Sequence, residues 1–233
     1  MSKINVVTVD GPSASGKGSL SRKIAQIFNL SILDSGSLYR LYAFFVEEGI
    51  NMSSIPEIIQ NNIKFKIIQD DLMITNLSDD ITSKLRSEQI ATLASELSSS
   101  EEVRNALFGI QRSFYTKKGL IADGRDMGTV VFKDAKLKIY LTASVEVRAH
   151  RRYLELQERG QEVNMPALIA DIEQRDLKDS SRELSPLLPA DEAHIIDSSE
   201  MSPEEVVKIT KKLIEEEYFC LLYTSDAADD GLS

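Results

Sequence analysis

Residues 4–19 read INVVTVDGPSASGKGS, and this stretch decides the fold. The apolar, β-branched run at 4–9 predicts a buried strand. A turn rich in glycine and serine follows, and Leu20, Ile24 and Phe28 then recur at helical spacing. Because a strand, a glycine loop and a helix follow one another, the sequence predicts the opening of an α/β fold.

The glycine loop carries the chemistry of a phosphate-binding loop (P-loop). Glycines let the backbone wrap a phosphate, the helix N-terminus adds partial positive charge, and Lys17 adds a full charge. A serine or threonine usually follows this lysine directly, whereas here Gly18 intervenes and Ser19 supplies the hydroxyl. The ending GKG[ST] is typical of kinases that phosphorylate nucleoside monophosphates. The alternative is a glycine-rich turn that happens to contain lysine, but the strand and helix on either side argue against it.

Composition narrows the possible partners. The chain has 233 residues, 42% of them hydrophobic, and a net charge of −10, which describes a globular protein and not a disordered one. A nucleic-acid polymer requires a basic face, so none is expected as a partner, although a local arginine cluster can still hold a small phosphorylated ligand.

The location of the protein is predicted from three observations. No apolar run reaches the roughly 20 residues of a membrane helix, so no membrane partner is expected. Asp10 interrupts the first apolar stretch, which argues against a secretory signal. The single cysteine, Cys220, allows no internal disulfide. We therefore expect a cytoplasmic protein.

The rest of the chain continues the α/β pattern. A second strand is expected at 31–33, a second helix at 37–48, an antiparallel hairpin at 64–76 around Asp70 and Asp71, further core strands at 120–122 and 137–141, and a last strand at 193–196. Helices and a hairpin between parallel-type strands indicate an inserted subdomain. Ser144 is expected to cap a helix that carries Arg148, Arg151 and Arg152, and Ser202 to Glu205 form a capping box for the last helix.

Three further segments carry candidate ligand-binding groups. The first, DSGSLYR at 34–40, follows a strand; its alternative is a helix cap with Arg40 in solvent. The second, DGRDMGT at 123–129, also follows a strand; its alternative is a structural ion pair. The third, 175–182, would place Arg175, Asp179 and Arg182 on one helix face; its alternative is a solvated charged surface. The ends of parallel strands form a ligand crevice, so the first two segments are expected to meet there.

Taken together, GPSASGKGS, LDSGSLYR, IADGRDMGTVVF and RRYLELQERG resemble the bacterial-type cytidylate kinases of the P-loop nucleoside monophosphate kinase superfamily. The resemblance runs over 1–220. It implies an α/β fold with a three-layer core around a parallel sheet, a monophosphate-binding insert at about 36–115 and a short lid at about 148–182. Residues 221–233 match nothing in the pattern and are expected to be a disordered or non-native tail.

The resemblance also implies the reaction and its groups. The γ-phosphoryl group of ATP would pass to CMP or dCMP with Mg²⁺ as cofactor, in a chain acting as a monomer. The implied catalytic residues are Lys17, Arg125 and Arg182. The implied ATP contacts are Gly11, Pro12, Ser13, Ala14, Ser15, Gly16, Lys17, Gly18, Ser19 and Arg151. The implied substrate contacts are Ser35, Arg40, Arg125 and Arg182 at the phosphate, Arg175 and Asp179 at the pentose, and Ser95, Arg104 and Asp126 at the cytosine. Ser19 and Asp123 are expected at the Mg²⁺ side, partly through water, with Asp10 a weaker candidate.

Three other interpretations were compared with this one. A P-loop switch GTPase would need an Asn-Lys-x-Asp segment, which the sequence lacks. A nucleotide-binding regulator without catalysis would have no use for a second arginine-lined site. Another small-substrate P-loop kinase, such as a UMP/CMP kinase, stays open as the alternative within the class, although such enzymes lack GRDMGTVVF.

Overall fold

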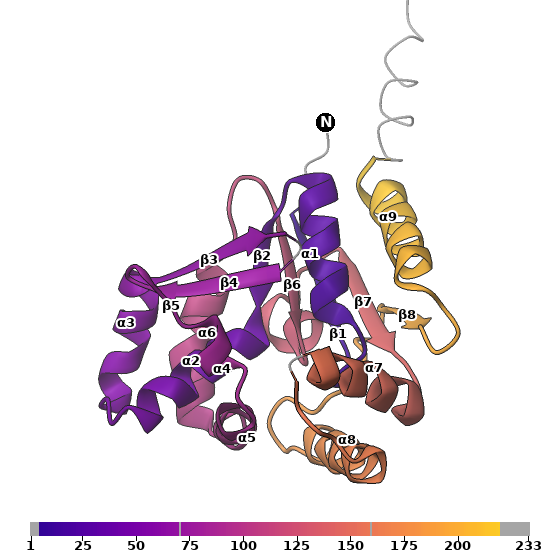
Figure 1. Ribbon diagram of the computed structural model, residues 1–233. Coiled ribbons are helices and arrows are strands. Elements are labelled where there is room, and N and C mark those ends of the chain that lie inside the picture. The colour runs from indigo at the N-terminus through magenta and orange to yellow at the C-terminus, as the bar shows by residue number, and fades with distance from the viewer. Residues whose placement is uncertain (1–4, 70, 159, 220–233) are drawn as a thin grey trace, which may run out of the picture.

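A parallel β-sheet forms the centre of the molecule. The computed structural model describes residues 5–69, 71–158 and 160–219. Its sheet has the strand order β2-β6-β1-β7-β8, every neighbouring pair being parallel (Figure 1). The strands are β1 (Val6–Asp10), β2 (Ser31–Asp34), β6 (Leu120–Gly124), β7 (Leu137–Thr142) and β8 (His194–Asp197). The predicted α/β fold class is confirmed.

Helices cover both faces of this sheet because alternate residues of a buried strand point to opposite sides. Val7 and Val9 pack in one cluster with α1 (Lys17–Phe28) and α9 (Pro203–Phe219). Val6 packs in the other cluster, with α2 (Ser35–Glu47) and α6 (Glu101–Ser113). The sheet is therefore the middle of three layers, and the loops at its carboxyl edge are held between rigid elements.

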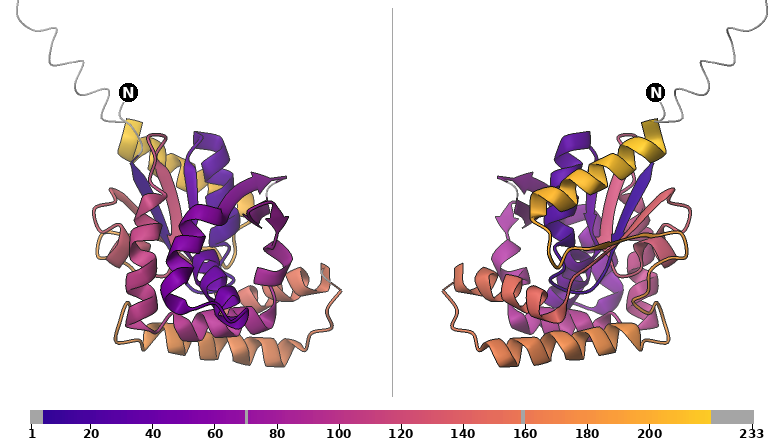
Figure 2. Two further views of the ribbon diagram at one scale, coloured as in Figure 1. Left: turned by 90° about the vertical axis from the view of Figure 1, so that its left-hand side faces the viewer. Right: turned by 90° about the vertical axis from the view of Figure 1, so that its right-hand side faces the viewer.

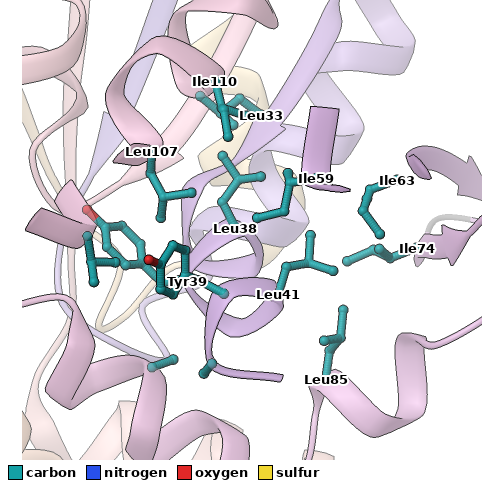
Figure 3. Packing of buried hydrophobic residues seen from close by; sticks show 14 of the residues in the cluster. Leu33, Leu38, Tyr39, Leu41, Ile59, Ile63, Ile74, Leu85, Leu107 and Ile110 are labelled. Atoms are coloured by element: carbon teal, nitrogen blue, oxygen red, sulfur yellow. The ribbon is translucent and has the colours of Figure 1, made fainter. Parts of the chain in front are cut away.

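The segment between β2 and β6 forms the insert. After α2 come the 3₁₀ turn η1 (Met52–Ser54), α3 (Ile55–Asn62), β3 (Ile63–Ile68), β4 (Asp71–Asn76), β5 (Asp79–Asp80), α4 (Thr82–Leu85) and α5 (Glu88–Leu97), and α6 follows. The pairing of β3 with β4 confirms the predicted hairpin, and the two-residue strand β5 was not predicted. Figure 3 shows Leu38 and Leu41 of α2 among Ile59, Ile63 and Ile74, so one apolar core joins the insert to the sheet.

Helices α7 (Val145–Glu158) and α8 (Met165–Ser180) occupy the segment predicted as a lid. They share a small apolar cluster of their own around Ala149, Leu156, Leu168 and Ile172. Figure 2 shows α8 along the lower edge of the molecule, beneath both the insert and the sheet. The domain limits proposed from the sequence, and the roles of the insert and the lid, stay predictions.

Two predicted helix caps are confirmed. The amide of Val147 donates to Oγ of Ser144 at 3.3 Å, and the Ser202–Glu205 box forms in both directions. Asp70, Cys220 and the tail at 221–233 lie outside the described residues. No helix among the described ranges is both long and apolar enough to cross a membrane.

Candidate active site

The P-loop runs from Gly11, directly after β1, to Ser19 in the first turn of α1. A Cβ atom at Gly11, whose φ is +148°, would lie 2.1 Å from the carbonyl oxygen of Leu141, so only glycine fits there. The Lys17 ammonium is buried and donates to the Pro12 carbonyl at 2.6 Å and to Oγ of Ser15 at 3.4 Å. The lysine thus lies inside the curve of its own loop, where a phosphate would sit.

A cleft of about 1550 Å³ opens at the carboxyl edge of the sheet. Its lining includes Ser13 to Ser19 from the P-loop, Asp123 from the end of β6 and Arg125 just after it, Arg40 and Ser95 from the insert, and Arg152 and Arg175 from α7 and α8. The sheet edge therefore brings into one cleft groups that lie far apart in the sequence, as expected for parallel strands.

The loop after β6 is held by Asp10, at the end of β1. Both carboxylate oxygens of Asp10 accept backbone amides, from Met127 at 2.8 Å and Gly128 at 2.7 Å. These amides open a short π-helix, Met127–Val131, which the sequence analysis did not predict. Burial raises the pKa of Asp10 to about 6. Since both oxygens already have donors, Asp10 supports the loop that carries Arg125 and Asp126.

Asp179 is a buried acceptor for two arginines. Nε of Arg125 donates to Oδ2 of Asp179 at 2.6 Å, and Nη2 of Arg182 lies 2.5 Å from Oδ1. The prediction that Arg175, Asp179 and Arg182 share a helix face is corrected here, because α8 ends at Ser180 and Arg182 lies past its cap. Nε of Arg182 is buried and has no hydrogen-bond partner in the described part of the chain, which leaves one donor for a ligand.

Arg104 and Asp126 form an ion pair beside this cluster. The Arg104 side chain is 13% exposed and that of Asp126 only 4%, so the pair is largely withdrawn from water. Arg104 lines a second cavity of about 190 Å³ together with Tyr39, Gln111 and Leu184. Burial raises the pKa of the Tyr39 phenol to about 12, which keeps it a neutral donor. Asp126 itself lines neither the cleft nor this second cavity, and its carboxylate is joined to the cavity through its ion pair with Arg104.

Arg40 and Ser35 were both predicted at a substrate phosphate, and they occupy different surroundings. Arg40 lines the cleft, and none of the hydrogen bonds or ion pairs found among the described residues involves it. Burial lowers the pKa of its guanidinium, so a nearby anion would be favourable. Ser35 is buried away from the cleft lining, and its Oγ accepts from Nε2 of Gln111 at 2.9 Å.

Gln111 was missed by the sequence analysis, although a signal existed. It lies with Val103, Leu107 and Ile110 among the buried residues of α6. A polar residue at a core position requires a partner, because an unpaired buried amide is costly. That reasoning would have singled out Gln111 as a residue that needs a buried polar partner. The structure shows that this partner is the hydroxyl of Ser35, the first residue of α2.

The three arginines of α7 have three different surroundings. Arg151 donates to the Ser15 carbonyl at 3.1 Å and to the Ser198 carbonyl at 2.7 Å, joining the P-loop to the segment after β8. Arg152 lines the cleft and pairs with Glu155 and with Glu88 of the insert. Arg148, which the sequence places on the same helix within the predicted lid, is 3% exposed and is absent from the cleft lining.

Arg175 also reaches Glu88, with Nη2 at 3.4 Å from Oε2. Glu88 therefore pairs with one arginine of α7 and one of α8 across the cleft, a link that the sequence analysis did not predict. Ser95 lines the same cleft from α5.

Lys17 and Asp123 face the same part of the cleft with opposite charges. Burial lowers the pKa of the Lys17 ammonium and raises the pKa of the Asp123 carboxyl, because each charged form loses water. A phosphate beside Lys17 and a cation beside Asp123 would each favour the charged form. Oδ2 of Asp123 is buried with no hydrogen-bond partner in the described part of the chain, and Ser19 lies at the same cleft.

These oxygens fit a magnesium ion that binds mainly to phosphates and water. No cluster of three or more His, Cys, Asp or Glu side chains suited to a metal occurs within the described ranges. A site with few protein ligands is typical of Mg²⁺ that arrives with a nucleotide.

A P-loop at the edge of a parallel sheet, facing arginines from an insert and from a helical segment, defines a P-loop kinase. Comparison with known proteins identifies the family. The family model described as cytidylate kinase matches residues 7–216, and the chain belongs to this family. The family recognised from the sequence motifs is thereby confirmed, and with it the assignment as a phosphotransferase.

Curated relatives agree with the family model. Cytidylate kinases of Yersinia pestis (strain Pestoides F) and of Yersinia pseudotuberculosis serotype O:1b are each 42% identical over 208 residues, covering 87% of this chain and 90% of the relative. Among solved structures, a gluconokinase from Sinorhizobium meliloti 1021 aligns with a TM-score of 0.50 and 13% identity, over 97% of this chain and 99% of its own. That likeness concerns the fold alone.

Proposed function

We propose that this protein transfers the γ-phosphoryl group of ATP to CMP or dCMP, giving ADP and CDP or dCDP. The observation that carries the proposal is the cleft itself, which is lined by the P-loop and by Arg125, while Asp179 joins Arg125 to Arg182 outside that lining. Phosphoryl transfer requires little covalent chemistry from a protein and depends on positioning and charge neutralisation. The P-loop and Arg125, which Asp179 holds in place, are positioned to serve both requirements.

The donor nucleotide is assigned to the P-loop side. Backbone amides of Gly11 to Ser19 would surround the ATP phosphates, and Lys17 would exchange its bond with the Pro12 carbonyl for one with the transferred group. Arg151 already bridges the P-loop and Ser198, and its planar guanidinium there suits contact with the adenine end.

The acceptor phosphate is assigned to Arg40, Arg125 and Arg182. Within the described ranges, Arg40 lines the cleft with no hydrogen bond or ion pair to the protein, and Nε of Arg182 has no hydrogen-bond partner. Arg125 is aimed by Asp179. These guanidiniums would hold the monophosphate and screen its repulsion from ATP. Arg175 and Asp179 are proposed at the pentose and Ser35 behind the phosphate, with Gln111 fixing its hydroxyl.

The base is assigned to Asp126, Arg104 and Ser95. Cytosine offers an N4 amine that a carboxylate accepts, and an O2 and an N3 that an arginine can donate to. Uracil would instead turn its O4 acceptor toward Asp126. An unpaired buried polar group costs about 1–3 kcal/mol, so this arrangement favours CMP over UMP.

Magnesium is proposed beside Ser19 and Asp123. When bound, Mg²⁺ would neutralise charge on the ATP phosphates during transfer. Ser19 would offer its hydroxyl, and Asp123 would accept from a water at Oδ2, which has no hydrogen-bond partner among the described residues. Both candidate nucleotide sites lie within one chain, so we also propose that a monomer is the active unit, which size-exclusion chromatography of the active enzyme would test.

The test is an assay of ADP release with Mg·ATP against CMP, dCMP, UMP, AMP and GMP. Strong turnover with CMP and dCMP alone is the expected result. Comparable turnover with UMP would favour the alternative, a UMP/CMP kinase, and would remove Asp126 from base recognition. Absence of turnover with every acceptor would overturn the proposed activity.

A further inference from the structure

Arg148 of α7 makes contacts that none of the assigned roles explains. Its Nη1 and Nη2 bind the two carboxylate oxygens of Asp176 in α8, at 3.1 Å and 2.5 Å. Its Nε donates to the Ala143 carbonyl at 2.9 Å, and its Nη1 also donates to the Ser13 carbonyl of the P-loop at 3.3 Å. All three guanidinium nitrogens are engaged, in a side chain that is 4% exposed.

Asp176 is thereby connected to the P-loop through the buried guanidinium of Arg148. A guanidinium that binds a carboxylate with two nitrogens fixes angle as well as distance. Three elements meet at Arg148: α8, the start of α7 and the P-loop. Few arrangements of these elements satisfy all of its donors together.

The last turns of α8 lack an apolar anchor. The buried residues of this helix are Leu168, Ile172 and Asp179, and Leu177 in the last turns is 69% exposed. Polar contacts therefore attach this end of α8: the buried ones are made by Asp176 and Asp179, and Arg175 adds a more exposed pair with Glu88. Asp179 holds Arg125 and Arg182, and Asp176 holds the P-loop side through Arg148.

We propose that Asp176 is a positioning residue, which acts through Arg148 to fix the spacing between the P-loop and the arginines around Asp179. The inference rests on the proposed function, because it assigns the two nucleotides to these two sides. A misplacement of about 1 Å between reacting groups can lower a rate about 100-fold. A displaced α8 would disturb the alignment of the two nucleotides, although the groups that contact them would all still be present.

The first variant is Asp176→Asn, which keeps the volume and removes the charge. We expect kcat with ATP and CMP to fall 10- to 100-fold, with KM for each nucleotide changing less than 3-fold. We also expect ATP hydrolysis relative to CDP formation to rise at least 3-fold, because poorly aligned CMP competes less well with water. A residue with a merely structural role would lower the melting temperature and leave these ratios unchanged.

Asp176→Asn leaves a buried arginine unpaired and can impair folding, so the double variant R148Q/D176N removes both charges. It is expected to fold and still to lose at least 10-fold in kcat. Asp176→Glu, which restores a carboxylate, should recover part of the loss. The matched control is Glu173→Gln, an exposed carboxylate of α8 outside the cleft lining, and its kcat should match the wild type.

The outcomes separate the two proposals. A wild-type protein without activity on CMP overturns the proposed function and this inference with it. If the wild type is active and the double variant folds with a normal kcat and an unchanged ratio of ATP hydrolysis to CDP formation, only the positioning role is overturned. The predicted pattern in the double variant, with a normal control, supports both.

Discussion

Nε of Arg125 lies 2.6 Å from Oδ2 of Asp179, although 54 positions separate the two residues in the chain. The contact joins the loop after strand β6 to the last turn of α8. Arg182 approaches the other oxygen of the same carboxylate. Asp179 thus sets how far apart two cations lie, and that spacing determines what anion they can hold.

Asp179→Asn should therefore weaken both stability and catalysis. The substitution leaves the buried guanidinium of Arg182 and the partly exposed guanidinium of Arg125 without a full counter-charge, and we expect a loss of about 3 kcal/mol in the free energy of unfolding. Because the substitution breaks a buried charged pair beside the proposed phosphate site, we expect kcat/KM for CMP to fall about 30-fold or more. Chemical denaturation and steady-state kinetics measure the two effects.

The matched control for this prediction is Asp134→Asn. Asp134 pairs with Arg112 at 3.5 Å, but the side chains are 77% and 45% exposed. An exposed pair contributes about 0–1 kcal/mol, so little change is expected in either measurement. Equal effects of the two substitutions would contradict the role given to Asp179.

Lys17→Met should abolish turnover and leave the fold intact. Methionine keeps the apolar stem of the side chain and removes the buried ammonium, whose charged form is disfavoured there by burial. The melting temperature should stay within a few degrees of the wild type, while kcat falls by at least 100-fold. A variant with normal activity would refute the assignment of this loop to ATP.

Asp126→Asn should reduce the preference for CMP over UMP. An asparagine side chain can turn an amide donor toward O4 of uracil, whereas the carboxylate cannot. We expect the ratio of kcat/KM for CMP and UMP to fall about 10-fold, as one recovered hydrogen bond implies. Competition assays with both acceptors measure this ratio directly, and an unaltered ratio would exclude Asp126 from base recognition.

Two glycines should respond in opposite directions to alanine. At Gly11 a methyl group would meet the Leu141 carbonyl at 2.1 Å, and φ is +148°, so Gly11→Ala should cost about 3 kcal/mol or more. At Gly109 in α6 a methyl group meets nothing within 4 Å. Gly109→Ala should stabilise the protein by about 0.5–1 kcal/mol through helix propensity. Thermal denaturation of the two variants tests both signs.

Local patterns were sufficient to predict much of the scaffold. The strand before the P-loop, the helix after it, the β3–β4 hairpin and the caps at Ser144 and Ser202 all depend on residues close in sequence. Such features follow from periodicity, glycine placement and capping chemistry. The family, too, could be recognised from contiguous motifs.

Long-range partners could not be predicted in the same way. Helical spacing fixes the angle at which Arg148 leaves α7, but it does not tell which element lies opposite, and Arg148 is buried against Asp176. The grouping of Arg175, Asp179 and Arg182 assumed a helix that extends past Ser180. The π-helix after Asp126 depends on acceptors supplied by Asp10, 117 positions earlier, which no local pattern encodes.

The same Asp10 should make stability depend on pH in a defined window. Burial, helped by the neighbouring Asp126 carboxylate, raises the pKa of Asp10, whereas the amides of Gly128 and Met127 and the Lys17 ammonium lower it. The effect of burial is the largest, so the pKa is about 6 in the folded state and 3.8 in the unfolded state. Between these values the folded state holds the proton and the unfolded state does not. The stabilisation of the folded state by this proton is therefore complete below pH 3.8. It is lost as the pH rises to 6, by up to about 1.4 kcal/mol per pH unit. In Asp10→Asn this titration is absent, so from pH 4 to pH 6.5 the wild type should lose about 2 kcal/mol of unfolding free energy relative to the variant. Urea denaturation across that range measures it, and parallel curves for the two proteins would show that Asp10 does not titrate there.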